Sequence, residues 1–321
     1  IPLFEIFRII LYEINFNVGL STEEINQAFK TVIIDIRLPR IFMGILVGLA
    51  LGASGAILQG LFRNPLIDPG FIGVSSGSAI GAMFVIMFFN FIGIENNFYL
   101  QFLLPSFAMV GGLIATFLVY NMSKISGKTN VMTMLLSGIA INAFSGSIIG
   151  FLVYKSSDIQ LRSFTFWTLG SLDNSNWLIV MISFLLILFP LIISYRMGDQ
   201  LDVFMLGDSD SRYLGLNIEK LKRKIIVISA IMVGVTVSFC GMIGFIGLVT
   251  PHLVRLIIGP SHRTLILGSG LLGSIILILA DFISRLIISP AQLPIGIITS
   301  ALGAPFFLWL IISYKSKFRY E

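Results

Sequence analysis

Side chains that could bind a metal or act as a nucleophile are few in this sequence. It contains two histidines, His252 and His262, and one cysteine, Cys240. Two histidines are too few for a histidine metal site, and one cysteine excludes an intrachain disulfide, a CxxC redox pair and a cysteine metal cluster. No carboxylate pair and no Ser-His-Asp arrangement stands out in a polar stretch. The residues therefore favour movement of a substrate over catalysis, and we expect the chain to be no enzyme.

One short motif is similar to the end of a nucleotide-binding phosphate loop. Residues 126–129 read Ser-Gly-Lys-Thr. A phosphate loop requires an earlier glycine at a fixed distance from Gly127, and Met122 occupies that position. No strand pattern precedes the motif. We therefore expect this chain to bind no nucleotide, no other cofactor and no metal of its own.

The composition excludes a soluble enzyme. Of the 321 residues, 56% are hydrophobic and 12% are charged, which is about half the charged share of an ordinary soluble domain. The mean hydropathy is +0.97, and the 31 glycines fit helices that lie in lipid. The net charge of +5 comes from short basic clusters between apolar runs, so we expect membrane lipid, and no nucleic acid, as a partner.

Apolar runs predict an all-α polytopic membrane protein. A spanning helix needs about 20 mainly apolar residues. The sequence predicts nine such helices, near 40–61, 72–92, 100–121, 131–154, 176–195, 225–242, 245–258, 265–289 and 294–314. The run at 245–258 is short and holds Pro251, which favours a broken or partly buried helix. We expect one domain over residues 1–321.

The positions of lysine and arginine predict the orientation, because cytoplasmic loops carry the excess of these residues. If the loop with Arg63 is cytoplasmic, strict alternation puts twice as many of the 21 basic residues inside as outside. The outer set is Arg8, Lys30, Arg37, Arg40, Lys155, Arg162 and Arg285. This arrangement predicts a cytoplasmic C-terminus and an external amphipathic segment over 1–36. An external N-terminus without a leader also predicts a further spanning helix before Ile1.

A polar stretch at 196–224 lies within the hydrophobic half of the chain, and by the charge count it is cytoplasmic. It still contains many apolar residues, with Gly207 and Gly215 as breaks between short helical pieces. Two amphipathic helices under the membrane would offer a docking face for a soluble partner, or they would simply lie on the membrane surface. The pattern alone leaves both interpretations open.

Charged residues also stand at the predicted outer ends of two helices. Arg37 and Arg40 flank the start of the first helix, where they would lie at the membrane interface. Asp281 and Arg285 are one helical turn apart and can pair on one face. An anchoring role and a recognition role are both open for these residues.

Several long motifs, in the same order, are similar to the FecCD family of ABC permeases. They read RLPR at 37–40, GLALGASGAILQGLFRNPLIDPGFIGVSSGSAIGA at 48–82, LGDSDSRYLGL at 206–216, GMIGFIGLVTPHLVRLIIGPSHR at 241–263, ADFISR at 280–285 and LPIGIITSALGAPFFLWLI at 293–311. The resemblance covers nearly the whole chain. It implies the membrane subunit of an importer of ferric siderophores, haem or cobalamin in the bacterial cytoplasmic membrane.

The family's architecture adds expectations that the residues alone do not give. It implies ten helices in the full-length subunit, a second permease copy or a homologous permease, and an extracytoplasmic substrate-binding protein. It also implies two cytoplasmic ABC ATPases, which bind the ATP and Mg²⁺. The start of this chain is similar to the short external helix that follows the family's first spanning helix.

The resemblance assigns roles to individual residues. Coupling to the ATPase is implied for Leu206, Gly207, Asp208, Ser209, Arg212, Leu214 and Gly215. Docking of the binding protein is implied for Arg37, Arg40 and Arg285. A gate or pathway role is implied for Asn64, Leu66, Thr129, Asn130, Val131, Met132, Ser137 and Asn142. Residues 129–132 are not the pair of small hydroxyl residues expected at this constriction.

The mechanism that follows is alternating access between two permease copies, driven by the ATPases. The alternative is an ion-coupled secondary transporter that works without an ATPase, although that interpretation leaves the large inner loop without a function. A membrane-embedded enzyme is a third interpretation and lacks a catalytic constellation. The motifs do not distinguish siderophore, haem and cobalamin as the cargo.

Overall fold

The computed structural model describes residues 2–13, 26–88, 97–288 and 291–317, and it is almost entirely helical. The N-terminal half comprises α1 (Leu3–Glu13), α2 (Gln27–Lys30), η2 (Thr31–Arg37), α3 (Leu38–Phe62), η3 (Pro69–Ile72), α4 (Val74–Phe88), α5 (Asn97–Met122), β1 (Lys124–Ile125), β2 (Lys128–Thr129) and α6 (Val131–Lys155). The C-terminal half comprises α7 (Asp158–Thr168), α8 (Trp177–Arg196), α9 (Gly198–Met205), α10 (Asp208–Tyr213), α11 (Ile218–Cys240), α12 (Ile246–Ile258), α13 (His262–Leu286) and α14 (Ile295–Lys317).

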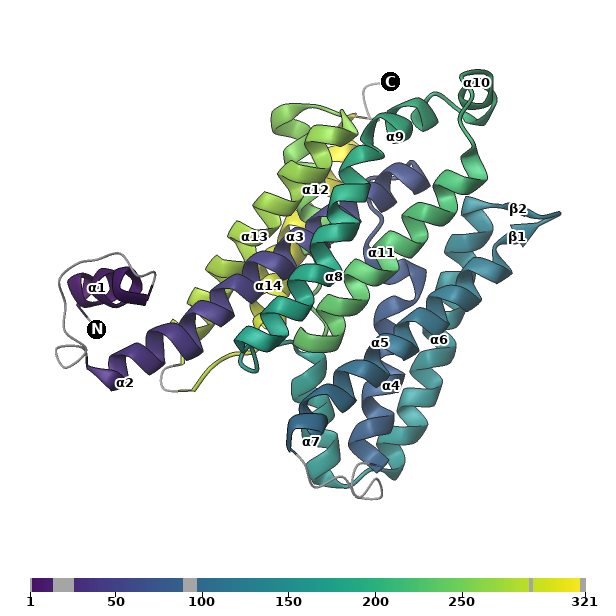
Figure 1. Cartoon of the computed structure of the whole chain (residues 1–321). Coiled ribbons are helices and arrows are strands. Elements are labelled where there is room, and N and C mark those ends of the chain that lie inside the picture. The colour runs from purple at the N-terminus through teal and green to yellow at the C-terminus, as the bar shows by residue number, and fades with distance from the viewer. Residues whose placement is uncertain (1, 14–25, 89–96, 289–290, 318–321) are drawn as a thin grey trace.

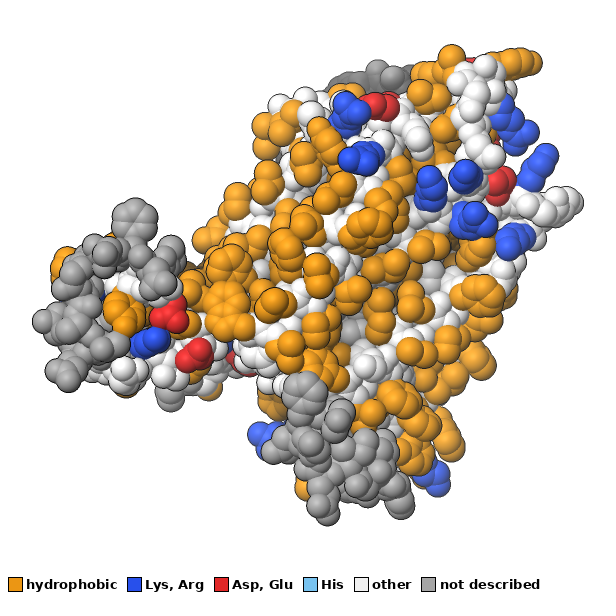
Figure 2. All heavy atoms as spheres, viewed as in Figure 1, with side chains coloured by type: hydrophobic (Ala, Val, Ile, Leu, Met, Phe, Trp, Pro, Cys, Tyr) orange, Lys and Arg blue, Asp and Glu red, His pale blue; other side chains and the backbone are white. Residues whose placement is uncertain are grey.

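The long helices lie side by side in one bundle (Figure 1). The β1–β2 hairpin, α9 and α10 lie at one end, and α7 lies at the opposite end. Helices α1 and α2 project from the side of the bundle. The faces of the helices turned to the viewer are largely apolar, and many of the basic side chains gather around the hairpin end (Figure 2).

The predicted spans are confirmed as helices. Among the described residues, six helices are long and apolar enough to cross a membrane, and α4, α12 and the part of α14 from Ile295 to Leu308 are shorter apolar helices. Helix α12 continues through Pro251, and its first turn is held by a hydrogen bond from the Thr250 hydroxyl to the Ile246 carbonyl. The all-α polytopic fold is therefore the one that the sequence predicts.

Two helices begin earlier than their apolar runs predict, in each case because charged residues continue the helix. The first long helix begins at Gln27 and runs without a break through η2 to Phe62, so the expected external segment over 1–36 holds α1 and the start of this helix. Asn26 caps the start by accepting a hydrogen bond from the Ala28 amide at 3.0 Å. Helix α11 begins at Ile218, so the loop predicted at 196–224 includes its first two turns.

Helix α3 is the most deeply packed element, because its small residues allow neighbouring backbones to approach. A Cβ added to Gly52 would lie 2.1 Å from the Ser269 carbonyl oxygen of α13, and one added to Gly55 would lie 1.8 Å from the Gly247 carbonyl oxygen of α12. Close backbone approach replaces the hydrophobic effect as the source of helix association in lipid. The small-residue stripe on α3 is thus a packing feature.

Helix α6 differs from α3 in that most of it faces outward. Only 17% of its most apolar 18-residue stretch is buried inside the chain. An added Cβ at Gly146 or Gly150 would meet no atom within 4 Å. Helix α6 therefore offers one of the surfaces on which lipid or another subunit can pack.

Candidate functional site

Helices α9 and α10 form a compact corner at the hairpin end of the bundle. Leu201 and Phe204 of α9 are buried, and Gly207 and Gly215 break the helices at φ values of 117° and 80°. A positive φ is far easier for glycine than for any residue with a Cβ. The two short helices that the sequence predicts are therefore confirmed, with both glycines at the breaks.

Apolar side chains of this corner point away from the bundle. Tyr213 is 90% exposed, and Leu206 and Leu214 are 61% and 64% exposed. The segment that holds the predicted coupling residues lies in this corner: Leu206, Gly207, Asp208, Ser209, Arg212, Leu214 and Gly215. The Ser209 hydroxyl contacts Asp210 at 3.3 Å. The corner thus combines an apolar outer surface with a charged inner surface.

Asp208 connects α10 to two cations from distant parts of the chain. Its Oδ1 accepts a hydrogen bond from Arg63 Nη2 at 2.7 Å, and its Oδ2 lies 3.7 Å from Lys222 Nζ. Arg63 follows α3 in the left-handed conformation, donates to the Phe204 carbonyl at 2.6 Å, and places its guanidinium over the Phe204 ring. Asp208 thereby ties the corner to the end of α3 and to the start of α11.

The start of α11 also holds the hairpin. Glu219 Oε2 accepts a hydrogen bond from the Thr129 amide at 2.9 Å, and Lys222 Nζ donates to the Thr129 carbonyl at 2.9 Å. We call Arg63, Asp208, Glu219 and Lys222 the Asp208 cluster. The cluster lines a cavity of about 490 Å³ together with Thr129, Asn130, Val131 and Met132. The structure thus brings the predicted coupling residue Asp208 and one predicted constriction to the same cavity.

The remaining predicted inner gate residues lie in turns and helix caps. Asn64 Oδ1 accepts a hydrogen bond from the Leu66 amide at 2.9 Å, which closes a tight turn after α3. Asn130 caps α6 by accepting a hydrogen bond from the Thr133 amide at 2.9 Å. Met132 is largely exposed. Their local structure is clear, and their proposed role in a gate remains a prediction.

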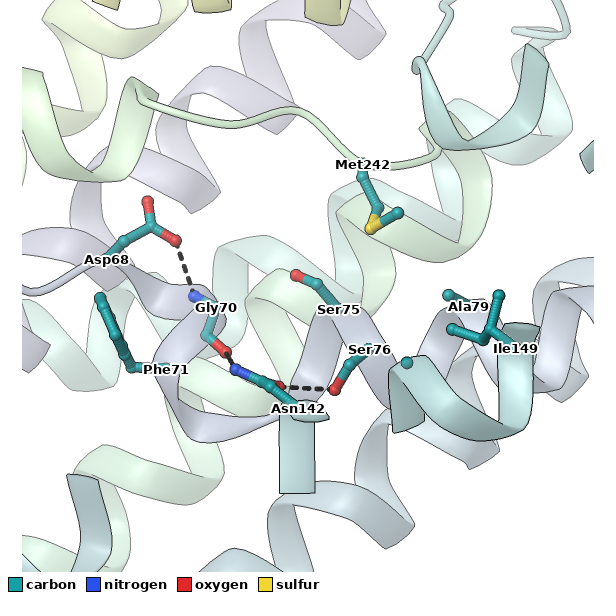
Figure 3. Close-up of a pocket in the computed structure, with 10 residues that line it drawn as sticks. Asp68, Gly70, Phe71, Ser75, Ser76, Ala79, Asn142, Ile149 and Met242 are labelled. Carbon is teal, nitrogen blue, oxygen red and sulfur yellow. Dashed lines mark hydrogen bonds between the residues drawn. The ribbon is translucent and has the colours of Figure 1, made fainter. Parts of the chain in front are cut away.

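A second cavity, of about 400 Å³, lies between η3, α4 and α6 (Figure 3). Ser76 Oγ donates to Asn142 Oδ1 at 2.7 Å, and Asn142 Nδ2 donates to the Gly70 carbonyl at 3.3 Å. Asp68 accepts from the Gly70 amide at 2.8 Å. Burial raises the pKa of the Asp68 carboxyl, and this hydrogen bond lowers it in part. Asn142 therefore contributes a polar side chain to a cavity whose lining is mostly apolar.

Ser137 differs from Asn142 although both lie on α6. Its side chain is buried, and it is not among the residues that line the second cavity. Gly138 beside it approaches the Phe71 carbonyl so closely that an added Cβ would lie 1.9 Å from the oxygen. Ser137 is thus a buried residue beside a tightly packed glycine, and the pathway role predicted for it stays a prediction.

A second ionic group lies at the other end of α3. Arg40 Nε donates to Asp281 Oδ1 at 2.8 Å, Arg40 Nη1 donates to Gln292 Oε1 at 2.9 Å, and Arg40 also pairs with Asp173. Arg285 Nη2 lies 3.0 Å from Asp281 Oδ2. We call Arg40, Asp173, Asp281, Arg285 and Gln292 the Arg40 cluster. It joins α3 and α13 to the loops before α8 and before α14.

Arg40 is less accessible to a partner than the other two arginines for which docking is predicted. Its side chain is only 9% exposed and is committed to partners of the same chain. Pro39 before it is also buried, so this turn of the helix packs inside the bundle. Arg37 is exposed, and Arg285 is 31% exposed. Arg37 and Arg285 are therefore the two predicted docking arginines that a partner can reach.

Sequence reasoning missed Arg63, Glu219, Lys222 and Asp68 as members of these sites. Lys222 belongs to the run Lys-Leu-Lys-Arg-Lys, in which the sequence alone does not distinguish it from an exposed topology signal. Within the described ranges, no group of three His, Cys, Asp or Glu residues is placed to hold a metal ion.

Comparison with known proteins agrees with the motifs. The model of the FecCD transport family matches residues 1–313. The chain is 41% identical to the hemin transport system permease protein HmuU of Yersinia pestis, over 91% of this chain and 86% of that protein. It is 37% identical to the cobalamin import system permease protein BtuC of Halobacterium salinarum, over 89% of this chain and 74% of that protein.

A solved structure has the same fold. It is an inward-facing conformation of a metal-chelate type ABC transporter, 31% identical, with a TM-score of 0.81 over 97% of this chain and 98% of that chain. The helical arrangement is therefore shared over almost the entire length.

Proposed function

The chain belongs to the FecCD transport family, and from this premise we propose that it moves a metal chelate, haem or cobalamin-type cargo into the cytoplasm by alternating access. It would do so as the permease subunit of a type II ABC importer. Separate ABC ATPases would bind ATP and Mg²⁺, and a substrate-binding protein would deliver the cargo. The partner permease would be a second copy or a homologous subunit.

The observation that carries this proposal is the α9–α10 corner. Tyr213, Leu206 and Leu214 are exposed at the end of the bundle where cations gather. A short helix that combines exposed apolar positions with charged positions can seat in a groove of a soluble protein. The attachment of the corner to α3 and α11 through Asp208 supports a role in transmitting force.

The orientation follows from the same end of the molecule. With the α9–α10 corner in the cytoplasm, Arg63 and the hairpin lysines are also cytoplasmic, in agreement with the positive-inside rule. The C-terminus would then be cytoplasmic, and Arg37 and Arg285 would face the outside of a bacterial cytoplasmic membrane. We infer that these two arginines receive carboxylates of the binding protein, which would steer docking and set its register.

The cavity beside Asn142 is suited to weak contact with a cargo that must be released. Ser75, Ser76 and Asn142 provide neutral polar groups, and Phe71 and Ile149 provide apolar surface. Asp68 adds one carboxylate. We infer that this cavity forms part of the pathway, because it opens beside α6. Of the described long apolar helices, α6 is the least buried inside the chain.

Reconstitution tests the proposal. The permease is co-expressed with its ATPase, purified as a complex and placed in liposomes with the binding protein. Uptake of labelled haemin, cobalamin and ferric siderophores is then measured with ATP inside the vesicles. We expect ATP-dependent uptake of one cargo that stops when the nucleotide site of the ATPase is disabled. Uptake that survives this change but stops when the ion gradient is dissipated would instead establish the secondary-transporter alternative.

A further inference from the structure

The backbone amide and the backbone carbonyl of Thr129 are both held by side chains of α11. The Thr129 amide donates to Glu219 at 2.9 Å, and the Thr129 carbonyl accepts from Lys222 at 2.9 Å. We call this arrangement of Thr129, Glu219 and Lys222 the Thr129 clamp. Because Glu219 and Lys222 are three residues apart, they lie on the same face of α11. The clamp therefore fixes the end of the hairpin against one helix.

The clamp lies directly before α6. Asn130 follows Thr129 and caps the helix by accepting from the Thr133 amide, and its own amide donates to the Ser123 carbonyl at 2.9 Å. The position of the Thr129 backbone thus sets where α6 begins. Helix α6 also carries Asn142, which lines the second cavity. A shift of the clamp would therefore displace α6 and the side chains with which it lines that cavity.

Lys222 is the member that reaches the corner. Its side chain is only 6% exposed, and its Nζ lies 3.7 Å from Asp208 Oδ2 and 3.8 Å from Glu219 Oε1. A buried ammonium group needs carboxylates or carbonyls around it, because burial of an unpaired charge is strongly unfavourable. Asp208 is 45% exposed and begins α10, so any displacement of α10 changes the charge environment of Lys222.

We propose that Glu219 and Lys222 are positioning residues that transmit displacement of the α9–α10 corner to the start of α6 through the backbone of Thr129. This inference rests on the proposed function, since it takes the corner to be the part that the ATPase moves. In the resting arrangement Lys222 is shared between Asp208 and Thr129. Withdrawal of Asp208 leaves Lys222 with Glu219 and the Thr129 carbonyl, and the clamp is free to shift with α11.

A static strut would predict a different outcome when the clamp is broken. Loss of a strut lowers the amount of folded complex, so uptake and ATP hydrolysis fall together. Loss of a transmission contact leaves hydrolysis in place and lowers the cargo moved per ATP. The ratio of uptake to hydrolysis therefore separates the two roles, whereas uptake alone does not.

The experiment uses the complete importer in liposomes with binding protein, with haemin, cobalamin and a ferric siderophore as the labelled probes. Lys222→Met removes the ammonium group and keeps a flexible chain, and Lys222→Arg keeps the cation. Lys220→Met removes an exposed cation from the same turn and is the matched control. For Lys222→Met we expect cargo moved per ATP to fall about tenfold, because one charge-assisted hydrogen bond is lost. Lys222→Arg should recover most of the ratio, and Lys220→Met should match the native complex.

A second variant keeps the inference testable if Lys222→Met misfolds. Glu219→Gln keeps the size of the side chain and weakens the contact with the Thr129 amide, so we expect a smaller fall in the same ratio. A native ratio in both Lys222→Met and Glu219→Gln would overturn the inference, as would equal losses in Lys222→Met and Lys220→Met. A native complex without ATP-driven uptake of any of the three probes would instead contradict the proposed function itself.

Discussion

The Arg40 cluster and the Asp208 cluster lie at opposite ends of α3 and are built differently. In the first, Arg40 and Asp281 are 9% and 5% exposed, and each has more than one partner. In the second, Arg63 and Asp208 are 36% and 45% exposed, and Lys222 alone is deeply buried. Asp173 of the first cluster is 48% exposed, but its central pair, Arg40 and Asp281, is buried, whereas the Arg63–Asp208 pair of the second cluster can exchange a partner for water. The comparison indicates that the Arg40 cluster fixes helices and that the Asp208 cluster permits movement.

Removal of Arg40 should give the largest effect on stability. Arg40→Met leaves Asp281 buried with Arg285 as its remaining cation, and breaking a buried ion pair on one side costs about 3–5 kcal/mol. Unfolding of the purified permease in detergent, followed against denaturant, measures the change. Arg37→Met is the control, because Arg37 is exposed one turn earlier, and its effect should stay within about 0.5 kcal/mol. Equal stability of the two variants would show that the Arg40 cluster does not hold the helices together.

Removal of Lys222 should give an intermediate effect. Lys222→Met leaves the Thr129 carbonyl without its donor at a buried position, and an unsatisfied buried group costs about 1–3 kcal/mol. The same denaturant experiment checks this value. A double-mutant cycle with Glu219→Gln should show coupling, since both side chains hold the backbone of the same residue. Strict additivity of the two changes would show that the clamp does not act as a unit.

Charge reversal at Arg285 tests the outward face of the Arg40 cluster. Arg285→Glu places a carboxylate next to Asp281 and at the surface where we propose that the binding protein docks. Exposed charges mainly change the association rate, so the affinity for the binding protein should fall about tenfold at low salt and less at high salt. Surface-immobilised permease complex and soluble binding protein provide the measurement. Unchanged affinity in both Arg285→Glu and Arg37→Glu would remove the docking proposal.

The sequence predicts the nine apolar helices and the two-helix corner because lipid demands long apolar runs and because Gly207 and Gly215 mark the breaks. It does not predict where the first helix and α11 begin, since Lys30, Asp35 and Lys222 continue helices whose apolar runs start later. It also does not predict the burial of Arg40, whose partner Asp281 lies 241 residues away along the chain. Burial of a charge depends on partners that only the tertiary structure brings together.

The smallest stability effect should come from substitution of Asp208, and this effect is the most direct test of the difference between the two clusters. Asp208→Asn weakens contacts with Arg63 and Lys222 in a region that water reaches, and exposed ion pairs contribute about 0–1 kcal/mol. The difference from the native protein should shrink further in 1 M salt, where the screening length is about 3 Å. Asp210→Asn, two positions away on α10, is the control. A loss as large as that of Arg40→Met would mean that the Asp208 cluster is as rigid as the Arg40 cluster. A corner held so firmly could not move relative to α11, and the proposed path from α10 through Lys222 to α6 would then be wrong.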